Sequence, residues 1–396
     1  MALADTAPSS LQDDFVEVCE LRQDGRLKTI IQKHNFGCGI RNACVVGAPV
    51  IPELKDDGDD AAVKSEPDLA DSFGLVSSAR PTTASAFPPQ MLMIVLETGN
   101  LVFLLARPRL DGHHELVASR YQSPHAFEGH LGFHAAVDPS SRYAALASPT
   151  DYFVIYELES RETLEERYLL GEPLAPVRSF RRRAVRGVIH KMTFLHPRPG
   201  DDHHIILLLV IVRHGRSKTV IYEWELGDDL RTVFADEKPG HRMPLEYQMP
   251  LLLVPLTVHS AFLVITEQQI AVCTECLHGP PKFDPIDMVH LASHRPRAPH
   301  PPLWTAWARP FRLQSYKKNR DCVYLAREDG VVLFMEADQE SPVAQCTPID
   351  PFPCAISTAF ACVFDRSTDV LLLGSNSGPG GYWKVSGLGP AARETS

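Results

Sequence analysis

The chain of 396 residues carries a formal net charge of −10, with 44% hydrophobic and 22% charged residues. This composition is that of a globular protein with a substantial core. Its acidic balance makes it a poor non-specific binder of nucleic acid, because that affinity comes from neutralising phosphates. The 33 prolines disfavour long helices, and no apolar run reaches the ~18 residues of a membrane helix.

The N-terminal part combines strand-like runs with a long acidic and proline-rich stretch. We expect residues 1–14 to be a disordered N-terminus without a secretory signal. FVEVCEL (15–21) and ACVVG (43–47) predict one hairpin, and FVEVCEL is also a candidate closing strand for the last blade of a ring. Residues 52–90 contain too little apolar sequence to offset the entropy of ordering. We therefore expect a disordered insertion there.

Six further hairpins follow, each a pair of apolar runs around turn residues. They span residues 91–106, 142–158, 204–226, 261–275, 322–337 and 369–385. Their spacing of about 50 to 60 residues is that of propeller blades with loops. Together with the N-terminal hairpin they predict an all-β fold, a single seven-bladed, WD40-like β-propeller over residues 15–387 with a tail at 388–396. A pair of β-sandwiches is the alternative, although its strands would lie about 8 to 12 residues apart.

The stretch LVIVRHGRS (209–217) contains the Arg-His-Gly of histidine phosphatases, in which the histidine is a nucleophile and the arginine clamps the phosphate. In that family a helix follows and helps to hold the phosphate. Here the alternating run KTVIYEWEL follows and predicts a returning strand. We therefore interpret Arg213, His214, Gly215 and Ser217 as hairpin-turn residues. A phosphatase remains an alternative, to be tested on an aryl phosphate.

One dense basic run, RSFRRRAVRG (178–187), stands out in this acidic chain. Its arginines are Arg178, Arg181, Arg182, Arg183 and Arg186. Guanidinium groups bind phosphates and acidic surfaces through forked donors, so the run is a candidate site for a partner or a nucleic acid. The alternative is a solvated loop between blades that pairs with the acidic insertion.

The segment WTAWARPF (304–311) places Trp304 and Trp307 beside Arg309. Tryptophan and arginine dominate interface hot spots, so an exposed segment of this kind predicts partner binding. The alternative is a buried anchor of one blade, because large aromatic side chains are mostly buried.

Cys273 and Cys276 form a CxxC pair with His278 two residues on. A structural zinc site needs further ligands, often a second pair, and a redox motif needs a βαβ context. Neither is found in the sequence. We interpret the pair as strand-end thiols of a protein in a reducing compartment.

The remaining histidines of interest form no metal-ligand pattern. The pairs His113-His114 and His203-His204 have no third ligand at strand or helix spacing. His134 and His190 fall within strand-like runs and are interpreted as core or edge residues. The sequence therefore predicts no catalytic residue, metal or cofactor, and no small-molecule substrate.

Several segments, taken as an ordered set, resemble the methyl-methanesulfonate-sensitivity family. They are AVDPSSRYAALA (136–147), VIHKMTFLHP (188–197), HHIILLLVIV with TVIYEWELGDDLR (203–231), MPLLLVPLTVHSAFLVITEQQIAV (249–272), PPLWTAWARP (301–310), YLAREDGVVLFMEA (324–337) and LLLGSNSGPGGYWKV (371–385). Its members are the large subunits of damaged-DNA-binding protein and of the cleavage and polyadenylation specificity factor, and splicing factor 3b subunit three. The resemblance covers most of the chain from about residue 88 and, more weakly, residues 15–50.

The resemblance implies the N-terminal seven-bladed propeller of a nuclear scaffold that organises partners and catalyses nothing. Such proteins run to about three propellers, whereas this chain has room for about one. The implied partners are protein subunits of a cullin-ligase, polyadenylation or splicing complex, with DNA or RNA as a further partner and no membrane. Direct nucleic-acid binding through the arginines of 178–186 is the alternative function.

Overall fold

The computed structural model describes residues 15–22, 27–47, 87–108, 114–126, 130–257, 260–287, 302–310, 320–338, 345–349, 359–365, 368–374 and 381–385. The predicted N-terminus at 1–14, the tail at 388–396 and residues 52–86 of the predicted insertion lie outside these ranges. No helix within them is long and apolar enough to span a membrane.

The described residues form five four-stranded sheets, in each of which neighbouring strands pair antiparallel in chain order. The first two are β3–β6 (Ile40–Val46, Met91–Leu96, Leu101–Pro108, His114–Tyr121) and β7–β10 (His134–Val137, Tyr143–Ala147, Tyr152–Leu158, Val177–Ala184). The next two are β11–β14 (Val188–Leu195, His204–Arg213, Arg216–Glu225, His241–Arg242) and β15–β18 (Leu252–Pro255, Phe262–Ile265, Ile270–Thr274, Lys282–Pro285). The fifth is β19–β22 (Trp304–Ala308, Arg320–Arg327, Val332–Asp338, Gln345–Ile349).

Two further sheets have fewer strands, and the prediction of seven blades is wrong. Sheet β23–β25 (Ala359–Asp365, Thr368–Gly374, Gly381–Val385) has three strands and β1–β2 (Val16–Leu21, Leu27–Lys33) has two, so the described residues form five blades. One of the two surplus blades is the 369–385 hairpin, which forms but belongs to the three-stranded sheet, and the other is the N-terminal hairpin, which does not form as predicted. Residues 43–46 lie in β3, which pairs with β4 and belongs to the same blade as the 91–106 hairpin. β1 pairs with β2, and within the described residues it closes no other sheet.

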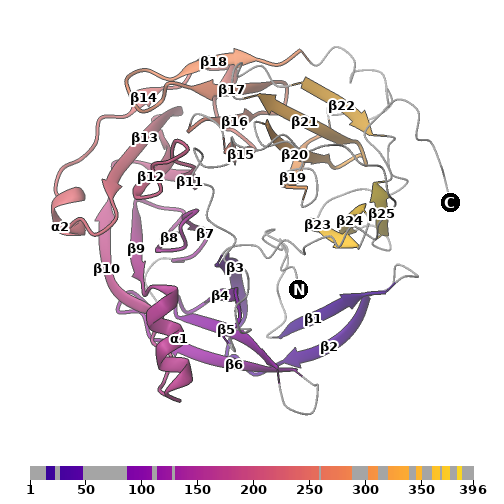
Figure 1. Ribbon diagram of the computed structural model, residues 1–396. Helices are drawn as coiled ribbons and strands as arrows, with labels where there is room; N and C mark the ends of the chain where they lie inside the picture. Colours follow the sequence, from indigo (N-terminus) through magenta and orange to yellow (C-terminus); the bar gives the residue numbers. More distant parts are fainter. Residues whose placement is uncertain are drawn as a thin grey trace, which may run out of the picture.

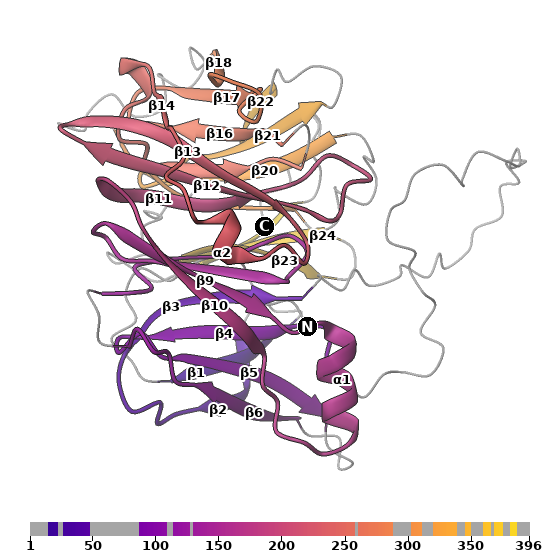
Figure 2. The same ribbon diagram turned by 90° about the vertical axis from the view of Figure 1, so that its left-hand side faces the viewer.

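The sheets stand around a ring and are not stacked as two sandwiches (Figure 1). The first strands of successive sheets contact one another, so β3, β7, β11, β15, β19 and β23 surround the axis. The last strands lie on the outside, and Figure 2 shows β10 and β13 crossing the outer wall obliquely. This all-β propeller architecture is as predicted.

The six hairpins predicted from residue 91 onward are confirmed. The antiparallel pairs β4–β5, β8–β9, β12–β13, β16–β17, β20–β21 and β24–β25 form them. Their middle strands are apolar on both faces because each blade is packed between two neighbours. In β12, for example, Leu207 and Leu209 pack in one cluster with Phe153 of the preceding blade, and Leu208 packs in another with Val264 of the following blade. The core therefore consists of layers between blades.

Helices are short and lie between the third and fourth strands of a blade. α1 (Arg161–Leu169) begins after Ser160, whose hydroxyl accepts the Thr163 N–H at 3.2 Å, a favoured N-cap arrangement. α2 (Leu230–Val233) is capped by Asp229, and the 3-10 turn η1 (Leu245–Tyr247) precedes β15. Phe87 is buried against Tyr168 near α1, so the last residues of the predicted insertion belong to the fold.

Candidate interaction surface

The Arg-His-Gly motif forms a two-residue hairpin turn, as its sequence context predicts. β12 ends at Arg213 and β13 begins at Arg216, and these two residues are paired across the hairpin. His214 (φ 50°) and Gly215 (φ 70°) both have positive φ, which a type I′ turn requires at its two central positions. The strand β13 stands where a phosphatase would have its phosphate-holding helix.

Ser217, the last residue of the motif, is buried and joins the hairpin to the next loop. Its hydroxyl accepts the Met249 N–H at 3.1 Å, and its carbonyl accepts the Met243 N–H at 3.1 Å. Its own N–H donates to the side-chain oxygen of Gln248. A serine of a phosphate-binding site would point to a ligand, whereas this one fixes the 243–249 loop against β13.

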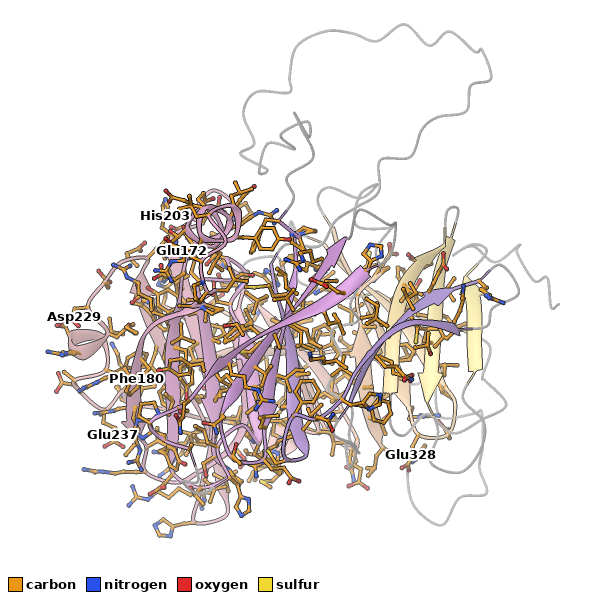
Figure 3. All side chains as sticks on the ribbon, turned by 90° about the horizontal axis from the view of Figure 1, so that it is seen from below. Glu172, Phe180, His203, Asp229, Glu237 and Glu328 are labelled. Atoms are coloured by element: carbon orange, nitrogen blue, oxygen red, sulfur yellow. The ribbon has the colours of Figure 1, made fainter. Side chains whose placement is uncertain are left out.

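Similar bonds recur around the ring between the turn of a central hairpin and the segment leading to a first strand. In each bond a backbone N–H donates to a backbone carbonyl. Glu97 donates to Gly39 at 2.9 Å, Val185 to Asp151 at 2.7 Å and Glu328 to Leu303 at 2.9 Å. These turns and segments therefore share one face, which we call the turn face. Figure 3 shows Glu328 on this side of the ring and His203 and Glu172 on the other.

Exposed apolar side chains recur on the turn face. Phe133, Val188, Met249 and Leu303 are 57%, 50%, 49% and 37% exposed, and each lies within three residues of the start of β7, β11, β15 or β19. Single exposed apolar residues need no explanation, but repetition around one axis makes a candidate interaction surface. The sequence contained the signal, since these residues recur at the blade spacing, but it was not recognised there.

Two histidines near the same end of the inner strands join neighbouring blades. His134 Nε2 donates to the Ile189 carbonyl at 3.2 Å, and His190 Nε2 donates to the Pro250 carbonyl at 2.9 Å. Burial, with the charge of Lys191, lowers the pKa of His134 to about 4, and the same causes lower the pKa of His190. Both are therefore neutral donors near pH 7, the structural role that their sequence context predicted.

The predicted arginine run lies on β10 and the residues just after it, at the outer wall of the ring. Arg178 pairs with Glu157 at 3.0 Å and Arg186 with Glu237 at 3.0 Å. Further contacts are those of Arg182, whose guanidinium lies 4.4 Å from the centroid of the Tyr152 ring, and of Arg183, which donates to the Ala235 carbonyl at 3.1 Å. Arg181 has a buried Nε without a hydrogen-bond partner among the described residues. Four of the five arginines are thus held by their own chain.

The predicted tryptophan–arginine site joins two blades. Trp304 is buried, and the Arg327 guanidinium lies over its ring at 5.5 Å. Arg309 lies 5.8 Å from the half-buried Trp307 ring, forms an ion pair with the buried carboxylate of Asp321, and donates to the Pro255 carbonyl.

The ion pair is part of a buried polar cluster. The Thr257 N–H donates to the other oxygen of Asp321 at 2.7 Å. The nearby His196 has a pKa lowered to about 3 by burial and by the charge of Arg309. Partner binding by Trp304, Trp307 and Arg309 stays a prediction, and their contacts here stabilise the junction between β15–β18 and β19–β22.

The CxxC thiols are buried. Burial raises the pKa of Cys276 to about 11 and raises that of Cys273 as well, so neither is a thiolate near neutral pH. The Cys276 Sγ lies 3.5 Å from the Ser260 carbonyl, and His278 accepts from Arg198 at 3.1 Å. Within the described ranges no three His, Cys, Asp or Glu side chains are grouped as metal ligands would be.

Comparison with known proteins identifies the family of the chain. Residues 11–395 match the family described as RSE1/DDB1/CPSF1 first beta-propeller. The resemblance inferred from the ordered segments is therefore confirmed over nearly the whole chain. A search among curated proteins finds no match.

Proposed function

We propose, because the chain belongs to the RSE1/DDB1/CPSF1 first β-propeller family, that it is a non-enzymatic scaffold that holds protein partners in a nuclear complex. The family is of the scaffold type. The partners that we propose are subunits of a DNA-repair ubiquitin ligase of the cullin type or of a polyadenylation or splicing complex. The proposed compartment is the nucleus.

The observation that carries this proposal is the construction of the turn face. Turns from separate blades are tied by backbone bonds to the segments that lead into the first strands, and these segments expose apolar residues around one axis. Surface loops on a rigid scaffold are the usual place for recognition. A preorganised surface also loses little conformational entropy when a partner binds.

Direct binding of nucleic acid through residues 178–186 is the second candidate. Arg178 and Arg186 already pair with carboxylates, and Arg182 and Arg183 have contacts within the chain. These contacts leave fewer free cations than the sequence suggests. A test is the salt dependence of RNA and DNA binding by the wild type and by an R181A/R182A/R183A variant. No binding at low salt would reject this candidate.

The test of the scaffold function is purification of the tagged full chain from nuclear extract, with partners identified by mass spectrometry. Stable recovery of ligase, polyadenylation or splicing subunits is the expected result, and the set recovered identifies the complex. A monodisperse chain that recovers no partner above an untagged control would reject the proposal. Turnover of an aryl phosphate that is lost in His214→Ala would reject its non-enzymatic part.

A further inference from the structure

The β11–β14 blade places like charges opposite each other at its turn-face end. Arg213 is paired with Arg216 across the β12–β13 hairpin, and Lys218 is paired with Arg242 between β13 and β14. Directly opposed residues in an antiparallel sheet have neighbouring side chains, and like charges there are destabilising. Two such pairs at one end of one blade cost stability, which points to a role outside the fold.

No carboxylate of the described residues lies within ion-pair distance of these four cations. None of them has an ion pair or a side-chain hydrogen bond within the described part of the chain, and Arg213, Arg216 and Arg242 are exposed. The nearby Glu237 is paired with Arg186. Glu246 is exposed on the neighbouring loop and forms no ion pair with the four cations among the described residues. The surface therefore has a local positive charge on a chain whose net charge is −10.

Exposed apolar residues lie at the same end of the blade, on the other side of the β12–β13 hairpin from these cations, and are held on a fixed backbone. Leu245 is 83% exposed at the start of η1, and Met249 ends the same loop. The side chain of Gln248 fixes that loop by donating to the Met243 carbonyl at 2.6 Å. Val188 pairs with Val212, the residue before Arg213.

The backbone of this loop is constrained at its end. Met249 has a φ of 51°, which is uncommon for a residue other than glycine, and its N–H is bonded to Ser217. Tyr247 is buried and stacks on Phe283 with ring centroids 5.0 Å apart. A long apolar side chain is thus held at the surface by a rigid loop, although sterically the position suits glycine.

We propose that this basic–apolar patch, formed by Val188, Arg213, Arg216, Lys218, Arg242, Leu245 and Met249, binds a peptide segment of a partner protein in which acidic residues flank large apolar ones. The proposal rests on the scaffold function and specifies the chemistry of one partner. Carboxylates of the peptide compensate the opposed cations, arginine being suited to bidentate contacts. Apolar side chains of the peptide cover Val188, Leu245 and Met249.

A peptide fits this patch better than a nucleic acid does. Single-stranded nucleic acids bind by stacking bases on aromatic side chains along a basic groove. The apolar members of the patch are two branched aliphatic side chains and one methionine, which offer no flat ring. We therefore expect a peptide in which acidic and aliphatic residues alternate. Binding of RNA is tested as the competing result.

The experiment measures binding of labelled synthetic peptides to the full chain by fluorescence polarisation. The main probe has glutamates flanking leucines, and its controls replace either the glutamates by glutamine or the leucines by serine. Single-stranded oligouridylate is the nucleic-acid probe. The protein variants are R213E/R216E and L245S/M249S, with Arg231→Glu as a control charge reversal away from the patch, at an exposed position on α2. Melting curves establish that each variant is folded.

We expect the acidic leucine peptide to bind the wild type and Arg231→Glu equally. In R213E/R216E the affinity for this peptide should fall about tenfold or more, and in L245S/M249S it should also fall. The affinity of the wild type should decrease as the salt concentration is raised. Three results would each overturn the proposal. The glutamine control could bind as tightly as the probe, or R213E/R216E could bind the probe as tightly as the wild type does. The third is oligouridylate binding that depends on the patch while the peptide does not bind.

The nuclear-extract purification separates this inference from the scaffold function. If the wild type recovers partners and R213E/R216E recovers the same set, the patch proposal fails and the scaffold function stands. If the wild type recovers no partner, the scaffold function itself fails.

Discussion

Two basic regions of the ring differ in how their charges are compensated. On and beside β10, Arg178 and Arg186 pair with Glu157 and Glu237. On the basic–apolar patch, Arg213 and Arg216 face each other and no described carboxylate pairs with either. The arginines of 178–186, although they are denser in the sequence, are thus less free to bind a partner than Arg213 and Arg216. Partners within the fold, more than arginine count, determine whether a cation is free to bind something else.

The strongest test of this comparison uses the most completely compensated arginine. Replacing Arg309 by methionine leaves the buried carboxylate of Asp321 without its cation. Breaking a buried ion pair in this way costs about 3–5 kcal/mol, because an uncompensated charge stays in the interior. We expect a loss of this size in the free energy of unfolding, measured by urea denaturation.

Arg213→Met is the matched control for this change. Arg213 is exposed and has no ion-pair partner among the described residues, so its replacement should leave the stability unchanged or slightly higher. Equal losses in the two variants would show that the compensated and uncompensated arginines do not differ in the way we describe.

The histidines beside the patch sharpen the comparison, because burial holds them neutral. The pKa of His134 is lowered to about 4, mainly by burial and then by Lys191, against about 6.5 in the unfolded chain. The contribution of this group is fully present above pH 6.5 and is lost as the pH falls from 6.5 toward 4, where the unfolded chain binds the proton first. The gap corresponds to at most about 3 kcal/mol.

The pH dependence is measured by urea denaturation at pH values from neutral to about 4. His134→Gln keeps a side-chain N–H donor and removes the titration, so we expect its stability to fall less over this range than that of the wild type. Parallel curves for the two proteins would contradict the assignment of the pH dependence to His134.

A smaller effect is expected at the arginines of β10. The variant R182A/R183A loses the stacking of Arg182 on Tyr152 and the bond from Arg183 to the Ala235 carbonyl. Together these contacts contribute about 1–2 kcal/mol, which we expect to find as a lower denaturation midpoint. R213A/R216A removes the same number of charges and should cost nothing. A midpoint that moves equally in both variants would remove the distinction between the regions.

The fold could be predicted from the sequence wherever a short stretch of residues is enough to identify an element. Turn residues between apolar runs identified six hairpins, and their spacing indicated a propeller. The count of blades was wrong for two reasons. The strand-like runs 15–21 and 43–47 were paired with each other, whereas β1 pairs with β2 and β3 with β4, and the 369–385 hairpin belongs to a sheet of only three described strands. Strand pairing over such separations depends on packing against neighbouring blades, which no local pattern records.

The candidate site was harder to predict than the fold. The context of Arg-His-Gly was enough to reject a phosphate site, because a strand-like run follows it. The patch comprises Val188, Arg216, Arg242 and Met249 among others. They come from separate segments and reach the same end of the blade only when β11, β13 and β14 pair and the 243–249 loop docks on Ser217. The sequence could not show that Glu157 and Glu237 neutralise part of the arginine run, since that also depends on pairing across the fold.

The smallest expected effect is also the most specific for the patch. Arg242→Glu replaces a like-charge pair with Lys218 by an opposite-charge pair, at an exposed position on the two-residue strand β14. We expect a gain of about 0.2–1 kcal/mol in unfolding free energy at low salt, which should shrink as salt screens the charges. Binding of the acidic leucine peptide should weaken in the same variant. Arg231→Glu, whose side chain has no opposed lysine, should change neither quantity. A gain in stability without a loss of binding would mean that the opposed charges have no role in recognition. A gain in stability together with a loss of peptide binding would show that these charges lower the stability of the blade and serve recognition.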